Sequence, residues 1–158
     1  MVQLESVMNY YESKFQSEFN REMDEMKMHK LLYFTQKESY VLNDAPLFKE
    51  DFYGWRYGPV LHEVREYYKA GLQYLENYNL SPLTSAEQGL LDQVFKKYAE
   101  VNSWTLSLLS HDEYSWQQSR KGLSETERGD MRMTKDNIRK DALYAKVLRK
   151  RFGNKYVV

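Results

Sequence analysis

Three histidines, His29, His62 and His111, are the side chains of this sequence best suited to bind a metal or to move a proton near neutral pH. Glu25 precedes His29 by four residues, so the two side chains share one face of a helix. A structural or catalytic zinc site needs three or four converging ligands, and neither paired histidines nor a carboxylate cluster accompanies this pair. We therefore predict no metal site, and we interpret Glu25 and His29 as an ion pair on a helix surface.

The residues Ser110, His111 and Asp112 have the side chains of a hydrolase triad, but they are adjacent in the chain. Triad residues come from separate segments in the known hydrolases, so adjacency is no sign of catalysis. Ser110 followed by Glu113 fits a helix cap better. The chain has no cysteine, no GxSxG motif and no glycine-rich phosphate loop. The sequence therefore predicts no enzyme and no cofactor.

The stretch DFYGWRYGPVLHEVREYY, residues 51–68, is the most distinctive of the sequence. Its first half is rich in aromatic residues, which pack well in a strand. Gly58 permits a backbone angle that other residues rarely adopt, and Pro59 fits the first position of a helix, which the later apolar spacing continues. We predict a strand, a rigid corner and a helix. A catalytic site is an alternative, if a pocket joins three residues of this stretch: Tyr57, His62 and Glu63.

Two long motifs of this chain resemble the Panacea domain, the SocA-like, phage-associated family. The first comprises MKMHKLLYFTQ at residues 26–36, APLF at residues 45–48 and WRYGPVLHEVREYY at residues 55–68. The family pattern is a helix reading roughly KLLYFAQ, a PLF segment and a W-[KR]-YGPV-x-x-E signature. The second motif lies in residues 83–120, where SLLSHDEYSW resembles the pattern S-x-L-[ST]-H-x-E-x-x-W. The resemblance covers roughly residues 23–144.

The resemblance implies an antitoxin or adaptor that binds and neutralises a toxin protein, often encoded beside it in bacteria and phages. Neutralisation could occlude the toxin or deliver it to a protease, and the residues leave both open. A rigid corner would hold the partner-binding groups in place, and Arg and Tyr dominate the energetics of many interfaces. The expected partner-binding residues lie in the two motifs: Trp55, Arg56, Tyr57, Gly58, Pro59, His62, Glu63, His111 and Glu113.

We expect the fold to be mainly α, a single compact helical domain of about six or seven helices with a small two-stranded β-ribbon. The ribbon is expected to pair residues 45–48 with residues 52–56. Residues 123–133 are expected to be a loop. The domain is expected to span residues 1–152, followed by a frayed basic tail at residues 153–158.

Apolar spacing predicts that the helix over residues 24–41 is central in the core. Three lysines of this helix are expected mostly on its outer surface: Lys27, Lys30 and Lys37. Thr84 and Glu87 have the spacing of a capping box at the start of a later helix. Trp104 and Trp116 are interpreted as core residues.

The net charge is zero, but the charges are unevenly placed. Residues 1–119 hold 11 Lys and Arg against 18 Asp and Glu, whereas residues 120–158 hold 12 against 5. The acidic part suits a basic partner. The basic end supports an alternative function, a phage or mobile-element regulator that binds nucleic acid through its C-terminal helix. We prefer the interpretation that the cations at residues 149–151 only solvate that helix.

The absence of cysteine and of a signal-peptide core favours a cytoplasmic protein. The sequence has no run of eighteen apolar residues, so no membrane partner is expected. Aromatic residues make up 15% of the chain, with 14 Tyr. Because Tyr combines apolar area with a polar tip, this excess suits both a core and a binding face.

Overall fold

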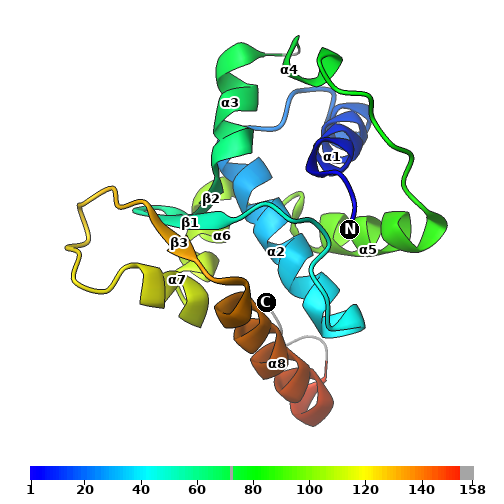
Figure 1. Cartoon of the computed structure of the whole chain (residues 1–158). Coiled ribbons are helices and arrows are strands. Elements are labelled where there is room, and N and C mark those ends of the chain that lie inside the picture. Colours follow the sequence, from blue (N-terminus) through cyan, green and yellow to red (C-terminus); the bar gives the residue numbers. More distant parts are fainter. Residues whose placement is uncertain (72, 154–158) are drawn as a thin grey trace.

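The computed structural model describes residues 1–71 and 73–153, which form eight helices and a small sheet (Figure 1). The strands are β1 (Phe52–Trp55), β2 (Gly58–Leu61) and β3 (Met131–Met133). The helices are α1 (Leu4–Phe19), α2 (Glu25–Asn43), α3 (His62–Ala70), α4 (Gln73–Glu76), α5 (Ser85–Tyr98), α6 (Ser103–Ser110), α7 (Tyr114–Ser119) and α8 (Lys135–Phe152). The prediction of a mainly α fold with a small β element is confirmed. The count of helices exceeds the expected six or seven, partly because the connection after α3 contains the short α4.

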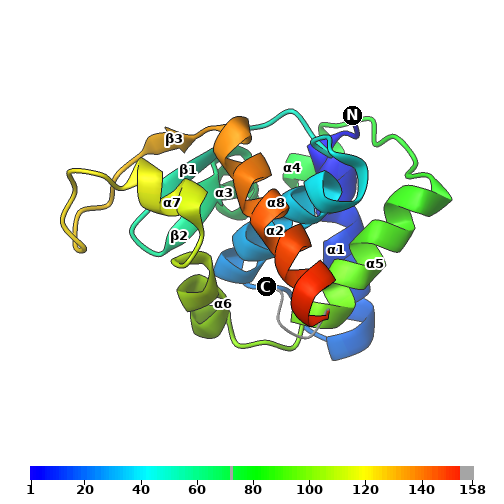
Figure 2. The ribbon, with the colours of Figure 1, turned by 90° about the horizontal axis from the view of Figure 1, so that it is seen from below.

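Helix α2 is the centre of the fold, and every residue from 27 to 41 is buried. Figures 1 and 2 show α1 and α5 to one side of α2 and α8 running beside it. Strand β2 and α6 pack against α2, whereas α7 packs mainly against α8, β1 and β3. Asp24 caps the helix, since its Oδ1 accepts a hydrogen bond from the amide of Lys27 at 2.8 Å. Because α2 has neighbours on all sides, its polar side chains must bond to those neighbours.

The expectation that the lysines of α2 lie on its outer surface is wrong. Lys27, Lys30 and Lys37 are only 4%, 1% and 5% exposed. Lys27 Nζ, for example, donates to the carbonyl oxygens of Ala99 at 2.6 Å and Val101 at 2.8 Å. A helix that is enclosed on every side has no outer face, so each ammonium group finds acceptors in a neighbouring element.

The sheet has three antiparallel strands in the order β2-β1-β3. Strand β1 pairs with β2 through Trp55 opposite Gly58, so Arg56 and Tyr57 form a two-residue turn. On its other edge β1 pairs with β3, with Phe52 opposite Met133. The hairpin of β1 and β2 therefore replaces the expected corner, and three residues of the loop expected at 123–133 form β3.

The expected ribbon between residues 45–48 and residues 52–56 is wrong. The backbone of Leu47 and Phe48 bonds instead to the buried side chain of Gln36. Gln36 Oε1 accepts from the amide of Leu47 at 2.7 Å, and Gln36 Nε2 donates to the carbonyl oxygen of Phe48 at 2.9 Å. This segment is thus held by α2 without forming a strand.

Gly58 has the backbone angle that the sequence predicts, with φ of +117°. A Cβ atom at this position would lie 2.5 Å from Ser110 Oγ and 2.7 Å from Lys30 Cε, so any side chain here would force these two residues to shift in addition to the strain of the backbone angle. Pro59, by contrast, lies in β2 opposite Gly54, and the helix begins only at His62. The prediction that Pro59 starts the helix is wrong.

Two further features concern the ends of elements. The predicted capping box is confirmed, because the amide of Glu87 donates to Thr84 Oγ1 at 3.1 Å and the amide of Thr84 donates to Glu87 Oε1 at 2.8 Å. The expected tail at residues 153–158 lies outside the described residues except for Gly153, which follows α8. None of the helices in the described part of the chain is long and apolar enough to cross a membrane.

Candidate protein-binding surface

Two side chains of α2, Lys30 and His29, bond to the backbone of the β1–β2 hairpin. Lys30 Nζ donates to the carbonyl oxygen of Pro59 at 3.1 Å. His29 Nδ1 accepts from the amide of Leu61 at 3.1 Å, and its Nε2 donates to Glu25 Oε2 at 3.1 Å. The predicted pair of Glu25 and His29 thus exists, but His29 is buried and both of its ring nitrogens are used, so it has no lone pair left for a metal.

Burial governs the ionisation of both residues. It lowers the pKa of His29 to about 4, so the ring is neutral at pH 7, as its accepting Nδ1 requires. Burial also lowers the pKa of Lys30 to about 7. Within residues 1–71 and 73–153, no group of three His, Cys, Asp or Glu side chains could hold a metal ion.

Helix α6 holds the turn of the hairpin from the side. Ser107 Oγ donates to the carbonyl oxygen of Tyr57 at 2.5 Å. The ring of Trp104 meets the ring of Tyr57 edge to face, with centroids 5.2 Å apart. The guanidinium group of Arg56 lies over the same Tyr57 ring at 4.9 Å. These contacts fix the orientation of side chains that remain open to solvent.

We call four exposed side chains of the hairpin turn and α6 the tip patch: Arg56, Tyr57, Trp104 and Leu108, which follows Trp104 by one helical turn. Tyr57 is 42% exposed, Trp104 57% and Leu108 66%, and Arg56 is exposed beside them. The interpretation of Trp104 as a core residue is wrong, whereas Trp116 is half-buried and packs against the core. Exposed aromatic and aliphatic side chains beside an arginine have the composition of an interface centre.

A hollow of about 500 Å³ lies next to the tip patch, lined by Arg56 and Tyr57 together with α7 and the loop that follows it. His111 stacks on Trp116 in its wall, with ring centroids 4.1 Å apart. Burial lowers the pKa of His111, so this ring too tends to be neutral. Arg120 donates to the carbonyl oxygens of nearby loop residues, which shapes the far wall. The structure thus brings Arg56, Tyr57 and His111 to one surface.

Trp55 and His62 belong to another group, on the outer face of the sheet. Both donate to Asp130 Oδ1, from Trp55 Nε1 at 2.7 Å and from His62 Nε2 at 2.9 Å. The His62 ring also stacks on Tyr53 at 3.9 Å. Asp130 is 75 residues from Trp55 in the sequence, and no local sequence pattern predicts that it bonds to Trp55 and His62. Tyr57 lines the hollow beside the tip patch, whereas His62 and Glu63 do not, so that hollow does not join the three residues of the alternative catalytic site.

Several other expected partner-binding residues are buried and support the surface from within. Gly58 and Pro59 are buried in strand β2 of the hairpin, whereas Glu63 is half-buried and its Oε1 has no hydrogen-bond partner. Glu113 is 7% exposed, and its Oε1 lies 2.6 Å from Lys37 Nζ. Burial raises the pKa of Glu113 to about 7, and the negative charge of Asp141 acts in the same direction.

Asp141 of α8 accepts hydrogen bonds from the first residues of α7 and so fixes the start of that helix. The sequence does not predict this role. The expected cap by Ser110 is absent, since α7 begins after Glu113 without a side-chain cap bond. Asp141 Oδ1 instead accepts from the amide of Tyr114 at 2.8 Å, and Oδ2 accepts from the amide of Ser115 at 3.1 Å and from the hydroxyl of Tyr33 at 2.8 Å. One buried carboxylate thus connects α2, α7 and α8.

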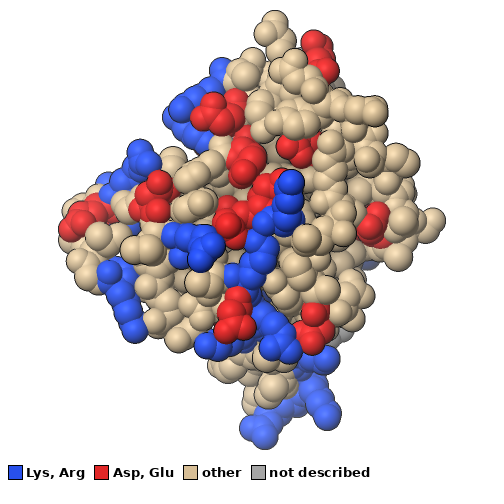
Figure 3. All heavy atoms as spheres, in the orientation of Figure 1, with Lys and Arg blue, Asp and Glu red and all other residues tan. Residues whose placement is uncertain are grey.

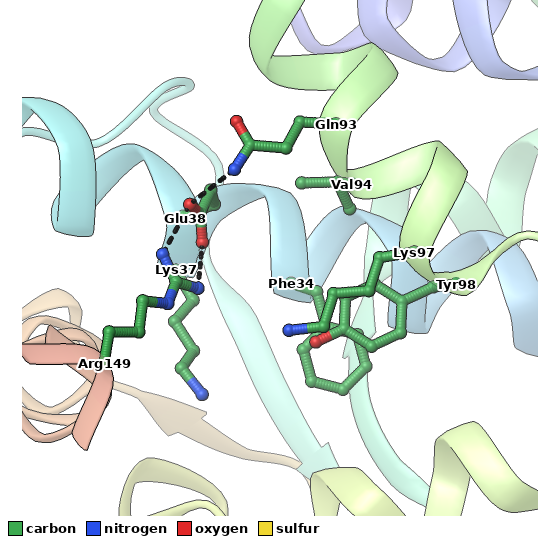
Figure 4. Close-up of a pocket in the computed structure, with 8 residues that line it drawn as sticks. All are labelled: Phe34, Lys37, Glu38, Gln93, Val94, Lys97, Tyr98 and Arg149. Atoms are coloured by element: carbon green, nitrogen blue, oxygen red, sulfur yellow. Dashed lines mark hydrogen bonds and ion pairs between the residues drawn. The ribbon is translucent and has the colours of Figure 1, made fainter. Parts of the chain in front are cut away.

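A smaller pocket of about 130 Å³ lies where α2, α5 and α8 meet (Figure 4). Figure 4 shows the Glu38 carboxylate facing Arg149, whose guanidinium donates two bonds to it, at 2.7 and 2.6 Å. Phe34 and Tyr98 stack beside this pair at 4.5 Å. Because Glu38 and Arg149 already form an ion pair with each other, we interpret this pocket as a packing contact between three helices and not as a ligand site.

Arg149 belongs to a series of ion pairs that join the basic end of the chain to its acidic part. Lys135 Nζ lies 2.6 Å from Asp51 Oδ1, and Arg139 Nε lies 2.7 Å from Asp44 Oδ1. Figure 3 shows acidic and basic side chains interleaved over much of the visible face, with basic ones gathered at the lower end where α8 finishes. The charge separation along the sequence is therefore partly neutralised within the fold.

The described residues form a mainly helical domain that presents a braced hairpin beside an exposed aromatic patch. Residues 28–117, more than half of the chain, match the family model described as "Antitoxin SocA-like, Panacea domain". The chain therefore belongs to the SocA-like antitoxin family with the Panacea domain, and the resemblance seen in its motifs is confirmed. No curated protein and no solved structure matches it.

Proposed function

We propose that this chain is the antitoxin of a toxin–antitoxin system and that it binds a cognate toxin protein through the tip patch. Membership of an antitoxin-like family supports the role. The observation that carries the binding site is the exposure of Tyr57, Trp104 and Leu108, since large apolar side chains grouped on a surface mark interaction sites. In this proposal the chain acts in the cytoplasm and without catalysis.

The contacts around the patch suit it to binding without a large rearrangement. Lys30 and His29 hold the hairpin, and Ser107 holds its turn, so Arg56 and Tyr57 are positioned before a partner arrives. Fixing side chains in advance reduces the entropy lost on binding. The hollow beside the patch offers space for a protruding side chain of the toxin. Direct occlusion of the toxin and delivery to a protease would both begin with this contact.

Coexpression with the neighbouring gene tests the proposal. We expect the neighbouring product to arrest growth of a bacterial host when expressed alone, and we expect the full chain to restore growth and to copurify with the product. If the chain occludes the toxin, rescue persists in a host that lacks its cytoplasmic unfoldase proteases; if it delivers the toxin, rescue fails there. A neighbouring product that is harmless alone, or that does not bind the chain, contradicts the proposal.

Binding of nucleic acid is the second candidate, and one observation favours it. Four cations of α8 have no acidic ion-pair partner within the described residues: Lys140, Lys146, Lys150 and Arg151. Arg149, in contrast, is bonded to the buried Glu38, so the earlier interpretation that it only solvates the helix end is wrong. Truncation before Arg149 would damage the core, and single substitutions are needed instead.

We expect the full chain to bind random duplex DNA weakly, because the strongest cationic contacts of α8 are satisfied internally. The measurement is a fluorescence titration at two salt concentrations, with Lys150→Gln and Arg151→Gln as variants. If these residues contact phosphates, each substitution should reduce the slope of log K against log salt by about 0.9. Tight binding with that loss of slope would favour the nucleic-acid function over the antitoxin proposal.

A further inference from the structure

The hollow of about 500 Å³ beside the tip patch is lined from two parts of the chain. The hairpin turn supplies Arg56 and Tyr57, and the end of α7 with the loop after it supplies residues 120 and 123–125. A volume of this size is in the range of sites that enclose a ligand. The charged groups of the lining determine which side chain of a partner the hollow suits.

Arg56 presents its guanidinium group at this hollow. The side chain is exposed and lies over the Tyr57 ring at 4.9 Å. Within the part of the chain that the structure describes, the guanidinium makes no hydrogen bond and no ion pair. The ring contact gives its N–H donors no oxygen acceptor, and this planar fork of donors matches the two oxygens of a carboxylate.

Arg120 adds a second positive charge to the lining. Its guanidinium donates to the carbonyl oxygens of Gly54 at 3.2 Å, Ser124 at 3.0 Å, Glu127 at 2.5 Å and Arg128 at 2.6 Å. Carbonyl groups carry no net charge, so these bonds hold the loop in place but leave the charge of Arg120 uncancelled. A negative group in the hollow would therefore be attracted by Arg120 as well as by Arg56.

The ionisation of His111, which also lines the hollow, reflects the same positive surroundings. Burial is the main cause that lowers the pKa of His111, and the charges of Lys30 and Arg120 lower it further. The charge of Asp112 raises this pKa, but by less than either cation lowers it. Two cations thus outweigh one acid at the His111 ring.

Glu125 is the acidic residue among the described residues that line the hollow. Its side chain is exposed, and it forms no ion pair with Arg56 or Arg120. The lining therefore has two guanidinium groups against one exposed carboxylate. This local excess of positive charge is opposite to the acidic balance of residues 1–119, from which a basic partner is expected.

We propose that the hollow receives an Asp or Glu side chain of the toxin, whose carboxylate bonds to Arg56 and is attracted by the charge of Arg120. This inference rests on the proposed function, since it takes the tip patch as the toxin-binding surface. Contacts of Tyr57, Trp104 and Leu108 with the toxin would keep water away from the ion pair, which strengthens it. A toxin with a basic group at this position would bind poorly, because like charges would meet.

Calorimetric titration of the full chain with the purified neighbouring product tests the sign of the charge. We expect Arg56→Glu to weaken binding at least about tenfold more than Arg56→Ala, because it adds repulsion to the loss of the bond. Glu125→Gln should tighten binding about two- to fivefold, since it removes a carboxylate that repels the carboxylate of the toxin. Damage to the fold cannot produce such a gain in affinity.

A matched control and a charge exchange complete the test. Lys150→Glu makes the same change of charge at an exposed position of α8 and should alter the affinity less than about twofold. Among toxin variants with one Asp or Glu replaced by Lys, we expect one that loses binding to the wild type and regains it with Arg56→Glu. Melting curves check that each variant folds.

The outcomes separate this inference from the proposed function. Equal losses for Arg56→Glu and Arg56→Ala would mean that an uncharged group occupies the hollow, and weaker binding by Glu125→Gln would mean that a basic group does. Either result overturns the inference and leaves the tip patch as the toxin-binding surface. A neighbouring product that does not bind the wild type overturns the inference together with the proposed function.

Discussion

Replacing Asp141 by Ala should lower the free energy of unfolding by about 3–5 kcal/mol, because one buried carboxylate accepts hydrogen bonds from three groups on two other helices. The change would leave the hydroxyl of Tyr33 and the amide of Ser115 without this acceptor in the interior. Denaturant unfolding followed by circular dichroism measures the effect. Loss of structure in α7 should follow, since α7 has no side-chain cap of its own.

Two matched substitutions make this result specific. Asp141→Asn keeps one carbonyl oxygen as an acceptor and should lose less stability than Asp141→Ala. Asp136→Ala removes an exposed carboxylate from the first turn of the same helix and should change stability far less. An unfolding midpoint for Asp141→Ala equal to that of Asp136→Ala would contradict the role assigned to Asp141.

The second large effect concerns binding. We expect Trp104→Ala to weaken toxin binding by about 2–4 kcal/mol, roughly 30- to 1,000-fold in Kd, while the fold stays intact. Trp104 is 57% exposed in the free chain and makes its ring contact with Tyr57, so its removal leaves no cavity in the core. Calorimetric titration with the purified toxin, beside melting curves of each variant, provides the measurement.

The controls for this prediction come from other surfaces. Tyr144→Ala removes an aromatic side chain of α8 that is 68% exposed and should leave affinity unchanged. Arg56→Ala should cost about 2 kcal/mol, roughly thirtyfold, as a member of the tip patch. His62→Ala distinguishes the two faces of the hairpin: a larger loss for His62 than for Trp104 would place the toxin on the outer face of the sheet and contradict the tip patch.

Features decided within a few residues could be predicted from the sequence. Gly58 needs its unusual φ because of the turn that it closes, and Thr84 and Glu87 form a cap through spacing alone. The central position of α2 also follows from its apolar residues. In each case the deciding interactions are local or depend on hydrophobic pattern, which is the information that a single sequence carries most directly.

Features that depend on distant partners could not be predicted in this way. Strand β2 contains Pro59, which also suits a helix start, and only pairing with β1 decides between them. Lys30 and Lys37 have an ordinary preference for water, and their burial becomes favourable only when a carbonyl or a carboxylate arrives from another element. Asp130 and Asp141 bond to residues more than twenty positions away.

The tip patch falls between these cases. Trp104 and Leu108 are four residues apart and so share one face of α6, whereas Leu106 points to the core. The spacing of Trp104 and Leu108 can be read from the sequence. However, α6 is short and apolar on most sides, so the pattern alone does not indicate which face of the helix is exposed. The position of the hairpin turn resolves the question, because Ser107 bonds to it and fixes the rotation of the helix.

The enclosure of α2 has a consequence for synthesis on the ribosome. This helix leaves the exit tunnel early. Yet its Tyr33 hydroxyl donates to Asp141 and its Glu38 carboxylate accepts from Arg149, both about a hundred residues later in the chain. A nascent chain therefore cannot complete its interior until its last helix emerges. Until then, we expect the central helix of the nascent chain to stay accessible to chaperones and proteases.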